Sequence, residues 1–127
     1  MMKKEIYSKK APKPIGSYSQ AIKINNLIFI SGQIGIDNET GKFNAKTIEE
    51  ETIIIMKNIN YILDEANCNF EDVIKTSIFL SKMTFFDDVN NVYKEYFNKP
   101  YPARETVEVS SLPKNVNVEI SMIASCK

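Results

Sequence analysis

The stretch SQAIKINNLIFISGQI, residues 19–34, holds two apolar segments that are joined by Asn25 and Asn26. Because asparagine tolerates a positive φ, this pair predicts a two-residue turn between antiparallel strands. Side chains alternate between the two faces of a strand, so we expect Tyr18 and Ser31 on one face of this ribbon. The register that follows pairs Ile24 with Leu27, Ile22 with Phe29, Gln20 with Ser31 and Tyr18 with Gln33.

The middle of the chain predicts two helices with a strand between them. Thr47 and Glu50 have the spacing of a capping box at the start of the first helix. Residues 73–80 contain several β-branched side chains, as a strand does. Thr84 predicts the start of the second helix, and Pro100 ends it. Apolar residues at helical spacing are Ile48, Ile55, Ile59, Ile62 and Ala66 in the first helix, and Phe86, Val89, Tyr93 and Phe97 in the second.

The last two apolar segments, residues 103–109 and 116–124, flank a Leu-Pro-Lys-Asn turn, and we expect them to pair as a second hairpin. The register that matches apolar side chains pairs Val109 with Val116 and Val107 with Val118. Its other face carries Thr106 opposite Glu119, with Arg104 one diagonal step away. A cation and a carboxylate on one polar face indicate a binding site or an interface.

This order of strands and helices indicates an α+β fold, in which two helices cover one face of a mixed sheet. The chain has 127 residues, which fit a single domain over residues 1–127. The other sheet face is partly apolar and has no helix to cover it, so we expect a homo-oligomer. The first fourteen residues hold five lysines and are expected to form a solvated arm.

The composition excludes several classes of protein. The chain has no histidine, which removes histidine-based nucleophile systems and HExxH zinc sites, and its net charge is zero, so we expect no nucleic-acid partner. Apolar runs are too short to span a membrane and none follows the first four residues, so we expect a cytoplasmic protein without a signal peptide. Cys68 and Cys126 are far apart in the sequence and do not form a CxxC motif, so we expect two reduced thiols and no metal site.

Arg104 is the one arginine of the chain, beside fifteen lysines. In a chain that otherwise uses lysine, it indicates a position that needs the planar guanidinium, which holds a carboxylate or phosphate by two parallel hydrogen bonds. The alternatives are a structural ion pair with Glu119 and a surface arginine without a role.

Several separated motifs resemble those of the RidA family, also called YjgF. They are Ile15-Gly16-Ser17-Tyr18-Ser19-Gln20-Ala21, Ile30-Ser31-Gly32-Gln33-Ile34, Val89-Asn90-Asn91-Val92-Tyr93, Pro102-Ala103-Arg104, Val107-Glu108-Val109, Leu112-Pro113 and Val118-Glu119-Ile120. The resemblance covers residues 5–124. It implies a chorismate-mutase-like α+β fold whose sheets form the core of a homotrimer, with ligand sites in the clefts between subunits.

The resemblance also implies a 2-iminobutanoate/2-iminopropanoate deaminase. Such an enzyme hydrolyses the reactive imines that PLP-dependent dehydratases release, giving a 2-oxo acid and ammonia without a metal or organic cofactor. Arg104 would hold the substrate carboxylate, and Glu119 would orient or deprotonate a water. The substrate-binding residues that the resemblance implies are Tyr18, Ser31, Gly32, Asn90 and Thr106. Glu105 stands where the family has a small residue, and alternation places it on the face opposite Arg104.

Two other functions are compatible with these residues. The same clefts could bind a 2-oxo acid or a similar metabolite without turnover, as a regulatory trimer. Some family members are described as translation-inhibiting ribonucleases, but the balanced charge and the absence of histidine and of a basic-aromatic stripe count against that activity here.

Overall fold

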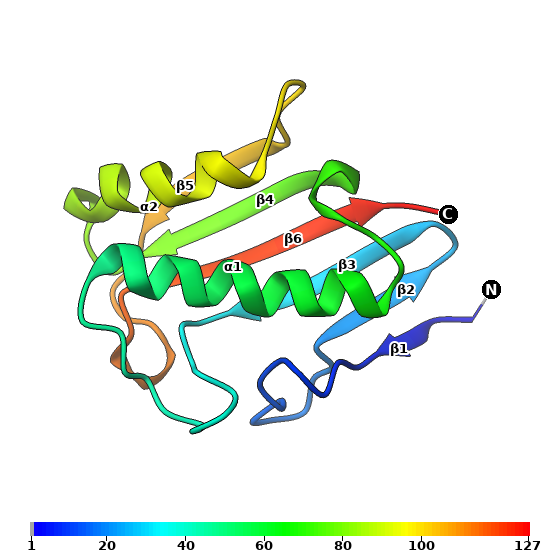
Figure 1. Ribbon diagram of the computed structural model, residues 1–127, viewed down its shortest axis with the longest axis horizontal. Helices are drawn as coiled ribbons and strands as arrows, with labels where there is room; N and C mark the ends of the chain where they lie inside the picture. Colours follow the sequence, from blue (N-terminus) through cyan, green and yellow to red (C-terminus); the bar gives the residue numbers. More distant parts are fainter. Residues whose placement is uncertain (1) are drawn as a thin grey trace.

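The computed structural model describes residues 2–127, which form a six-stranded mixed sheet with two α-helices on one of its faces (Figure 1). The strands lie in the order β1-β2-β3-β6-β4-β5. They are β1 (Lys4–Ile6), β2 (Ala21–Ile24), β3 (Leu27–Gln33), β4 (Val73–Leu80), β5 (Ala103–Glu108) and β6 (Val118–Ser125). The helices are α1 (Ile48–Glu65) and α2 (Phe86–Tyr93), with 3₁₀ turns η1 (Phe70–Asp72), η2 (Met83–Phe85), η3 (Lys94–Tyr96) and η4 (Pro113–Asn115). Within residues 2–127, no helix is both long and apolar enough to cross a membrane.

The β2–β3 hairpin forms in the predicted register, with Ile24 opposite Leu27 and the turn residue Asn25 at φ 53°. One residue before β2, the Gln20 carbonyl accepts from the Ser31 N–H of β3 (2.9 Å), as the prediction requires. The ladder stops there. Tyr18 does not pair with Gln33, because its N–H instead donates to the Gly16 carbonyl (3.0 Å) in a tight turn.

The prediction that the N-terminal arm is simply solvated is wrong, because residues 4–6 form the edge strand β1. This strand pairs antiparallel with β2, with Ile6 opposite Ala21. Ile6 is buried in the core, while Lys4 and Glu5 are exposed. The buried residues Ile6, Ser8 and Ala11 therefore attach the arm to the core despite its polar composition.

Helix α1 begins where its cap predicts. The Thr47 hydroxyl accepts from the Glu50 N–H (3.0 Å), and the Glu50 carboxylate accepts from the Lys46 N–H (2.8 Å), one residue before the cap. The apolar stripe of the helix, with Ile55 and Ile59 fully buried, packs on the sheet. Helix α2 starts later than predicted, at Phe86, after the turn η2, and has no side-chain cap.

The predicted hairpin of residues 103–109 with 116–124 is wrong. Strand β4 lies between these two segments, parallel to β5 and antiparallel to β6. Strand β4 carries the more apolar pattern, with Thr76, Ile78 and Leu80 completely or almost completely buried, so the interior of the sheet is its favourable place. Helix α2 supplies the crossover that a parallel β4–β5 pair requires.

Glu51 of α1 sets the point at which β6 begins. Its carboxylate is 1% exposed and accepts three hydrogen bonds, from the backbone N–H groups of Asn117 (2.8 Å) and Val118 (2.9 Å) and from the Asn117 side-chain amide (2.9 Å). Hydrogen bonds to a charged acceptor are stronger than neutral ones. This contact therefore positions the strand that carries Glu119.

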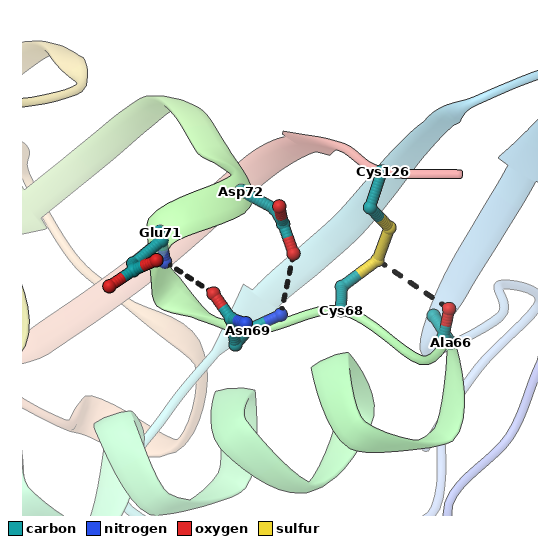
Figure 2. The surroundings of a disulfide bond; sticks show 6 residues. All are labelled: Ala66, Cys68, Asn69, Glu71, Asp72 and Cys126. Atoms are coloured by element: carbon teal, nitrogen blue, oxygen red, sulfur yellow. Dashed lines mark hydrogen bonds between the residues drawn. A yellow bond between two sulfur atoms is a disulfide. The ribbon is translucent and has the colours of Figure 1, made fainter.

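The expectation of two free thiols is also wrong, because Cys68 and Cys126 form a disulfide bond (Figure 2). Their Cα atoms lie 5.9 Å apart, although 58 residues separate them in the sequence. The end of β6 pairs with the start of β4, with Ala124 opposite Val73, and this pairing brings Cys126 to the connection between α1 and β4. Sequence spacing does not reveal such a long-range contact.

Candidate functional site

The candidate residues fall on two opposite faces of the sheet. Residues directly opposite each other on paired strands point to the same face. Arg104 pairs with Thr76, which is buried beneath the helices, so Arg104 faces the helix side. Glu119 pairs with Phe79, whose side chain points to the face of β4 opposite that of Thr76. Glu119 therefore points to the face without helices. The prediction that Arg104, Thr106 and Glu119 share one face of a hairpin is thus wrong within one chain.

The first group, which we call the arginine half-site, consists of Arg104, Asn90, Phe86, Tyr93 and Thr106. The Arg104 Nη1 donates to the Asn90 Oδ1 (2.8 Å). The guanidinium carbon lies 5.4 Å from the centre of the Phe86 ring and 5.0 Å from that of Tyr93, which are distances of cation–π contact. The amide and the two rings therefore hold the guanidinium in one orientation.

Helix α2 supplies these three partners from one stripe. Phe86, Asn90 and Tyr93 follow the spacing i, i+4, i+7, which places them on the same side of the helix, toward β5. Sequence reasoning identified Phe86 and Tyr93 only as apolar helix positions, and their spacing with Asn90 was the available signal. The Tyr93 hydroxyl shares a hydrogen bond with the Thr76 hydroxyl (2.9 Å), and burial raises the pKa of Tyr93.

Two features of the arginine half-site suit an anionic ligand. Among residues 2–127, Arg104 forms no salt bridge, and its side chain is exposed at the edge strand. It lines a cavity of about 280 Å³ together with Asn90, Tyr93, Lys94, Tyr101 and Pro102. Thr106, two residues further along β5, has a buried hydroxyl without a hydrogen-bond partner in the described part of the chain. Leaving such a buried group unpaired costs about 1–3 kcal/mol, and Thr106 does not line the cavity.

Glu105 does not interfere with Arg104. As alternation predicted, its side chain lies on the opposite face, where it forms a salt bridge with the Lys75 Nζ (3.0 Å) and accepts a hydrogen bond from the Ser77 hydroxyl. The hydrogen bond from Ser77, followed by that from Lys75, lowers the pKa of Glu105. The carboxylate beside Arg104 in the sequence is therefore engaged elsewhere within the chain.

The second group, the glutamate half-site, consists of Tyr18, Ser31, Gly32 and Glu119. It is built on an irregularity of β3. Ile30 pairs with Met122 and Gln33 pairs with Ile120, so the two residues Ser31 and Gly32 lie opposite the single residue 121. This is the arrangement of a β-bulge, which bends the strand and leaves one residue outside the regular ladder. The Ser31 hydroxyl donates to the Ser19 carbonyl (2.6 Å) and is thereby held against the preceding segment.

Gly32 allows the carboxylate of Glu119 to lie against the bulge. A Cβ atom at residue 32 would stand 2.6 Å from the Glu119 Oε2 and 2.7 Å from its Cδ, so no larger residue fits without displacing the carboxylate. Burial raises the pKa of Glu119. A carboxyl group with a raised pKa is suited to proton transfer.

Tyr18 lies at the same end of the sheet. It lines a cavity of about 320 Å³ that Gly32, Gln33 and Lys13 also line. Its hydroxyl accepts from the Ile15 N–H (3.2 Å), and its ring is half exposed. Within the chain this cavity is open to a further molecule, and none of the arginine half-site residues contributes to it.

Gln20, which sequence reasoning did not assign to the site, shapes one wall of this cavity. Its buried side-chain amide accepts from the Ser8 N–H (2.7 Å) and donates to the carbonyls of Ser8 (3.1 Å) and Pro12 (3.0 Å). These bonds attach the segment before Lys13 to the core. The pattern that could have revealed Gln20 was a polar residue inside an otherwise apolar strand segment.

Comparisons with known proteins agree with this fold and with the motifs. The family described as Endoribonuclease L-PSP matches residues 8–126, and the chain belongs to this family, which includes the RidA and RutC proteins. It is 49% identical over 124 residues to a RutC family protein of Pyrococcus abyssi, with 98% of each chain covered. It is 40% identical over 124 residues to the 2-iminobutanoate/2-iminopropanoate deaminase of Homo sapiens, with 98% of this chain and 90% of the human protein covered.

A solved structure extends the likeness to three dimensions. The E. coli protein TdcF, crystallised with bound serine, is similar with a TM-score of 0.91 and 33% identity, covering 98% of this chain and 99% of TdcF. The predicted RidA resemblance and the predicted α+β fold are both confirmed.

Proposed function

We propose that this protein hydrolyses small 2-imino acids to 2-oxo acids and ammonia, at sites that two copies of the chain complete together in a homotrimer. The observation that carries the proposal is Arg104, which is exposed, held by Asn90 and two rings, and without an acidic partner in residues 2–127. A guanidinium in this state is suited to a small carboxylate. The human relative named as an imine deaminase, and the serine bound to TdcF, support a small amphoteric ligand of this kind.

The placement of the two half-sites supports a shared site. Arg104 lies on the helix side of edge strand β5, whereas Glu119 lies on the open face of central strand β6. The open face also exposes the apolar side chains of Phe29 and Val107, at 42% and 40% of their surface. Packing this face against another copy would bury them and would bring the glutamate half-site of one copy to the arginine half-site edge of its neighbour. The cytoplasmic location remains a prediction.

The proposed chemistry is an addition of water followed by loss of ammonia. In the balanced reaction, R–C(=NH)–COO⁻ and H₂O give R–CO–COO⁻ and NH₃. Arg104 holds the carboxylate with two parallel hydrogen bonds, which leaves the adjacent imine carbon at a defined distance from the other half-site. The site positions the reactants and moves protons, and the chain's own residues suffice for both roles.

Glu119 acts on the water in this proposal. It takes a proton from the water as the oxygen adds to the imine carbon, and it returns a proton to the nitrogen as ammonia leaves. Burial raises its pKa, which makes the carboxylate a stronger base toward the water than an ordinary glutamate. The backbone at Ser31 and Gly32, opened by the bulge, and the backbone at Thr106 complete the polar contacts around the substrate in this proposal.

A site without turnover is the second candidate. The bound serine of TdcF favours it, since serine is a ligand with a carboxylate but no imine. Both candidates use Arg104, and only the role of Glu119 separates them. RNA cleavage, which the family description suggests, is not favoured because the chain has no histidine and no net charge.

The test is the release of 2-oxo acid and ammonia from an imine that an amino-acid oxidase generates in the assay. We expect the wild type to accelerate release, and Arg104→Ala and Glu119→Gln to abolish that acceleration. Glu39→Gln, in the exposed turn at residues 37–42, is the matched carboxylate control and should behave as the wild type. If the wild type binds a 2-oxo acid through Arg104 but releases nothing, the function without turnover is the correct one.

A further inference from the structure

We propose that the thiolates of Cys68 and Cys126, when reduced, bind one Zn²⁺ ion together with the carboxylate of Asp72, and that the disulfide replaces the metal when the pair is oxidised. This site lies at the end of the sheet where α1 leads into β4, apart from both half-sites. The three residues each offer one donor atom, and these atoms all lie within 4.8 Å of one another. Figure 2 shows them around the connection between α1 and β4.

Three separate elements hold the donors in place. Cys68 follows α1, and its N–H donates to the Leu63 carbonyl (2.9 Å). Cys126 follows β6, and its N–H donates to the Asn26 carbonyl (2.8 Å). Asp72 ends η1. Because each backbone is fixed by its own element, the site requires side-chain rotation only.

The carboxylate of Asp72 is already oriented. Its Oδ2 accepts from the Asn69 N–H (2.9 Å), and the Asn69 Oδ1 accepts from the Glu71 N–H (2.8 Å), which makes a reciprocal cap on η1. A hydrogen bond of this kind to a ligating carboxylate fixes its direction and supports metal affinity. A carboxylate has two oxygens with about four lone-pair sites, so this single hydrogen bond leaves acceptor capacity for the ion.

The donor set selects the metal. Two thiolates and one carboxylate favour a thiophilic divalent ion such as Zn²⁺ over Ca²⁺ or Mg²⁺, which prefer oxygen ligands. In a tetrahedral zinc site with Zn–S bonds of about 2.3 Å, two sulfurs stand about 3.7 Å apart, so the sulfurs of Cys68 and Cys126, which are bonded to each other in the oxidised pair, separate by side-chain rotation when the metal binds. Cys68 is buried, while Asp72 and Cys126 are half-buried, so a water can reach the fourth position.

The exchange between metal and disulfide balances with a small-molecule disulfide as oxidant. The two thiolates give up two electrons and form the Cys68–Cys126 bond, Zn²⁺ leaves, and the external disulfide takes the electrons and becomes two thiolates. A dithiol reverses the step. The metal-bound and disulfide-bonded states therefore exclude each other.

The experiment uses reduced full-length protein, freed of reductant by gel filtration under argon, and titrates it with Zn²⁺ alone and then with Co²⁺. We expect one Zn²⁺ per chain, protection of both thiols from an alkylating reagent, and a cobalt–thiolate charge-transfer band. The oxidised protein should show none of these. No imine substrate enters the assay, so its result does not depend on the proposed deaminase activity.

Two matched variants locate the third ligand. Asp72→Asn keeps an oxygen for the Asn69 cap but removes the charged ligand, and should weaken Zn²⁺ binding by at least the roughly 10-fold that loss of an outer-shell partner causes. Glu71→Gln removes the same charge from the neighbouring residue, whose carboxylate points away from the cysteines in Figure 2, and should bind as the wild type does. The proposal is wrong if reduced wild type takes up no more Zn²⁺ than the oxidised protein, or if Asp72→Asn binds with unchanged affinity.

Discussion

Gly32→Ala tests how closely the bulge and the carboxylate of Glu119 are fitted. The new Cβ would stand 2.6 Å from Oε2, 2.7 Å from Cδ and 3.0 Å from Cγ of Glu119. Ordinary contacts of this kind require about 3.5 Å, so the carboxylate must move by about 1 Å. A misplacement of about 1 Å can reduce turnover about 100-fold, which corresponds to about 2.7 kcal/mol in the activation free energy.

The assay is steady-state imine hydrolysis, together with thermal unfolding of the same variant. We expect kcat to fall about 100-fold while KM changes little, because Arg104 still holds the substrate carboxylate. The contact involves the mobile end of a side chain, so the unfolding free energy should fall only by about 1 kcal/mol, the low end of overpacking effects. Gly16→Ala is the control, because its Cβ would meet no atom closer than 3.5 Å.

A double variant separates the steric cause from a backbone effect. In a Glu119→Ala background, adding Gly32→Ala should cost no further stability, since the clashing carboxylate is gone. Full activity in Gly32→Ala alone would refute the reasoning, because the observed position of Glu119 would then have no bearing on turnover.

Four further predictions follow from the same geometry. Arg104→Lys should raise KM about 10- to 100-fold in steady-state kinetics, because an ammonium group cannot make the bidentate contact; an unchanged KM would argue against a carboxylate clamp. Burial raises the pKa of Glu119. As the solution is acidified, kcat/KM should therefore begin to fall at a higher pH than it would with an ordinary glutamate, and Glu119→Gln should lack this acidic limb of the pH profile. The same raised pKa links the stability of the fold to pH. Glu119 favours the folded state at pH values below the pKa of unfolded glutamate, and this contribution is lost as the pH rises through the pKa of Glu119 in the folded protein. In denaturant titrations near neutral pH, Glu119→Gln should therefore be more stable than the wild type. Glu51→Ala leaves three donors at Asn117 and Val118 without an acceptor, so the unfolding free energy should fall by about 3 kcal/mol or more in those titrations. Ser125→Ala, at the exposed last residue of β6, is the control, and a loss in Glu51→Ala no larger than in this control would contradict the role of Glu51 in positioning β6.

Local signals in the sequence predicted the local structure well. The Asn25-Asn26 turn set the β2–β3 register, and the Thr47 cap set the start of α1, because each depends on residues only a few positions apart. The family of the chain was likewise recognisable from motifs. What local signals could not supply was the partner of β5, which is the distant strand β4 and not the neighbouring segment in the sequence.

That one pairing explains why the site was only partly predicted. Arg104 and Asn90 are brought together as expected, and so are Gly32 and Glu119, but the insertion of β4 places the two pairs on opposite faces. The disulfide escaped prediction for the same reason, since its cysteines meet through the pairing of β6 with β4. Contacts between distant segments depend on the whole sheet order, which short sequence patterns do not encode.

The most direct test of a site shared between copies is to mix two inactive variants. Arg104→Ala and Glu119→Gln chains are unfolded, mixed in equal amounts and refolded, and mixed oligomers are verified by native mass spectrometry. If each site takes Arg104 from one copy and Glu119 from another, random assembly restores about a quarter of the wild-type activity per chain, because half of the chains supply each intact residue. If mixed oligomers form and the mixture stays as inactive as its parents, both residues act within one chain or the activity lies elsewhere, and a site completed by two copies is contradicted.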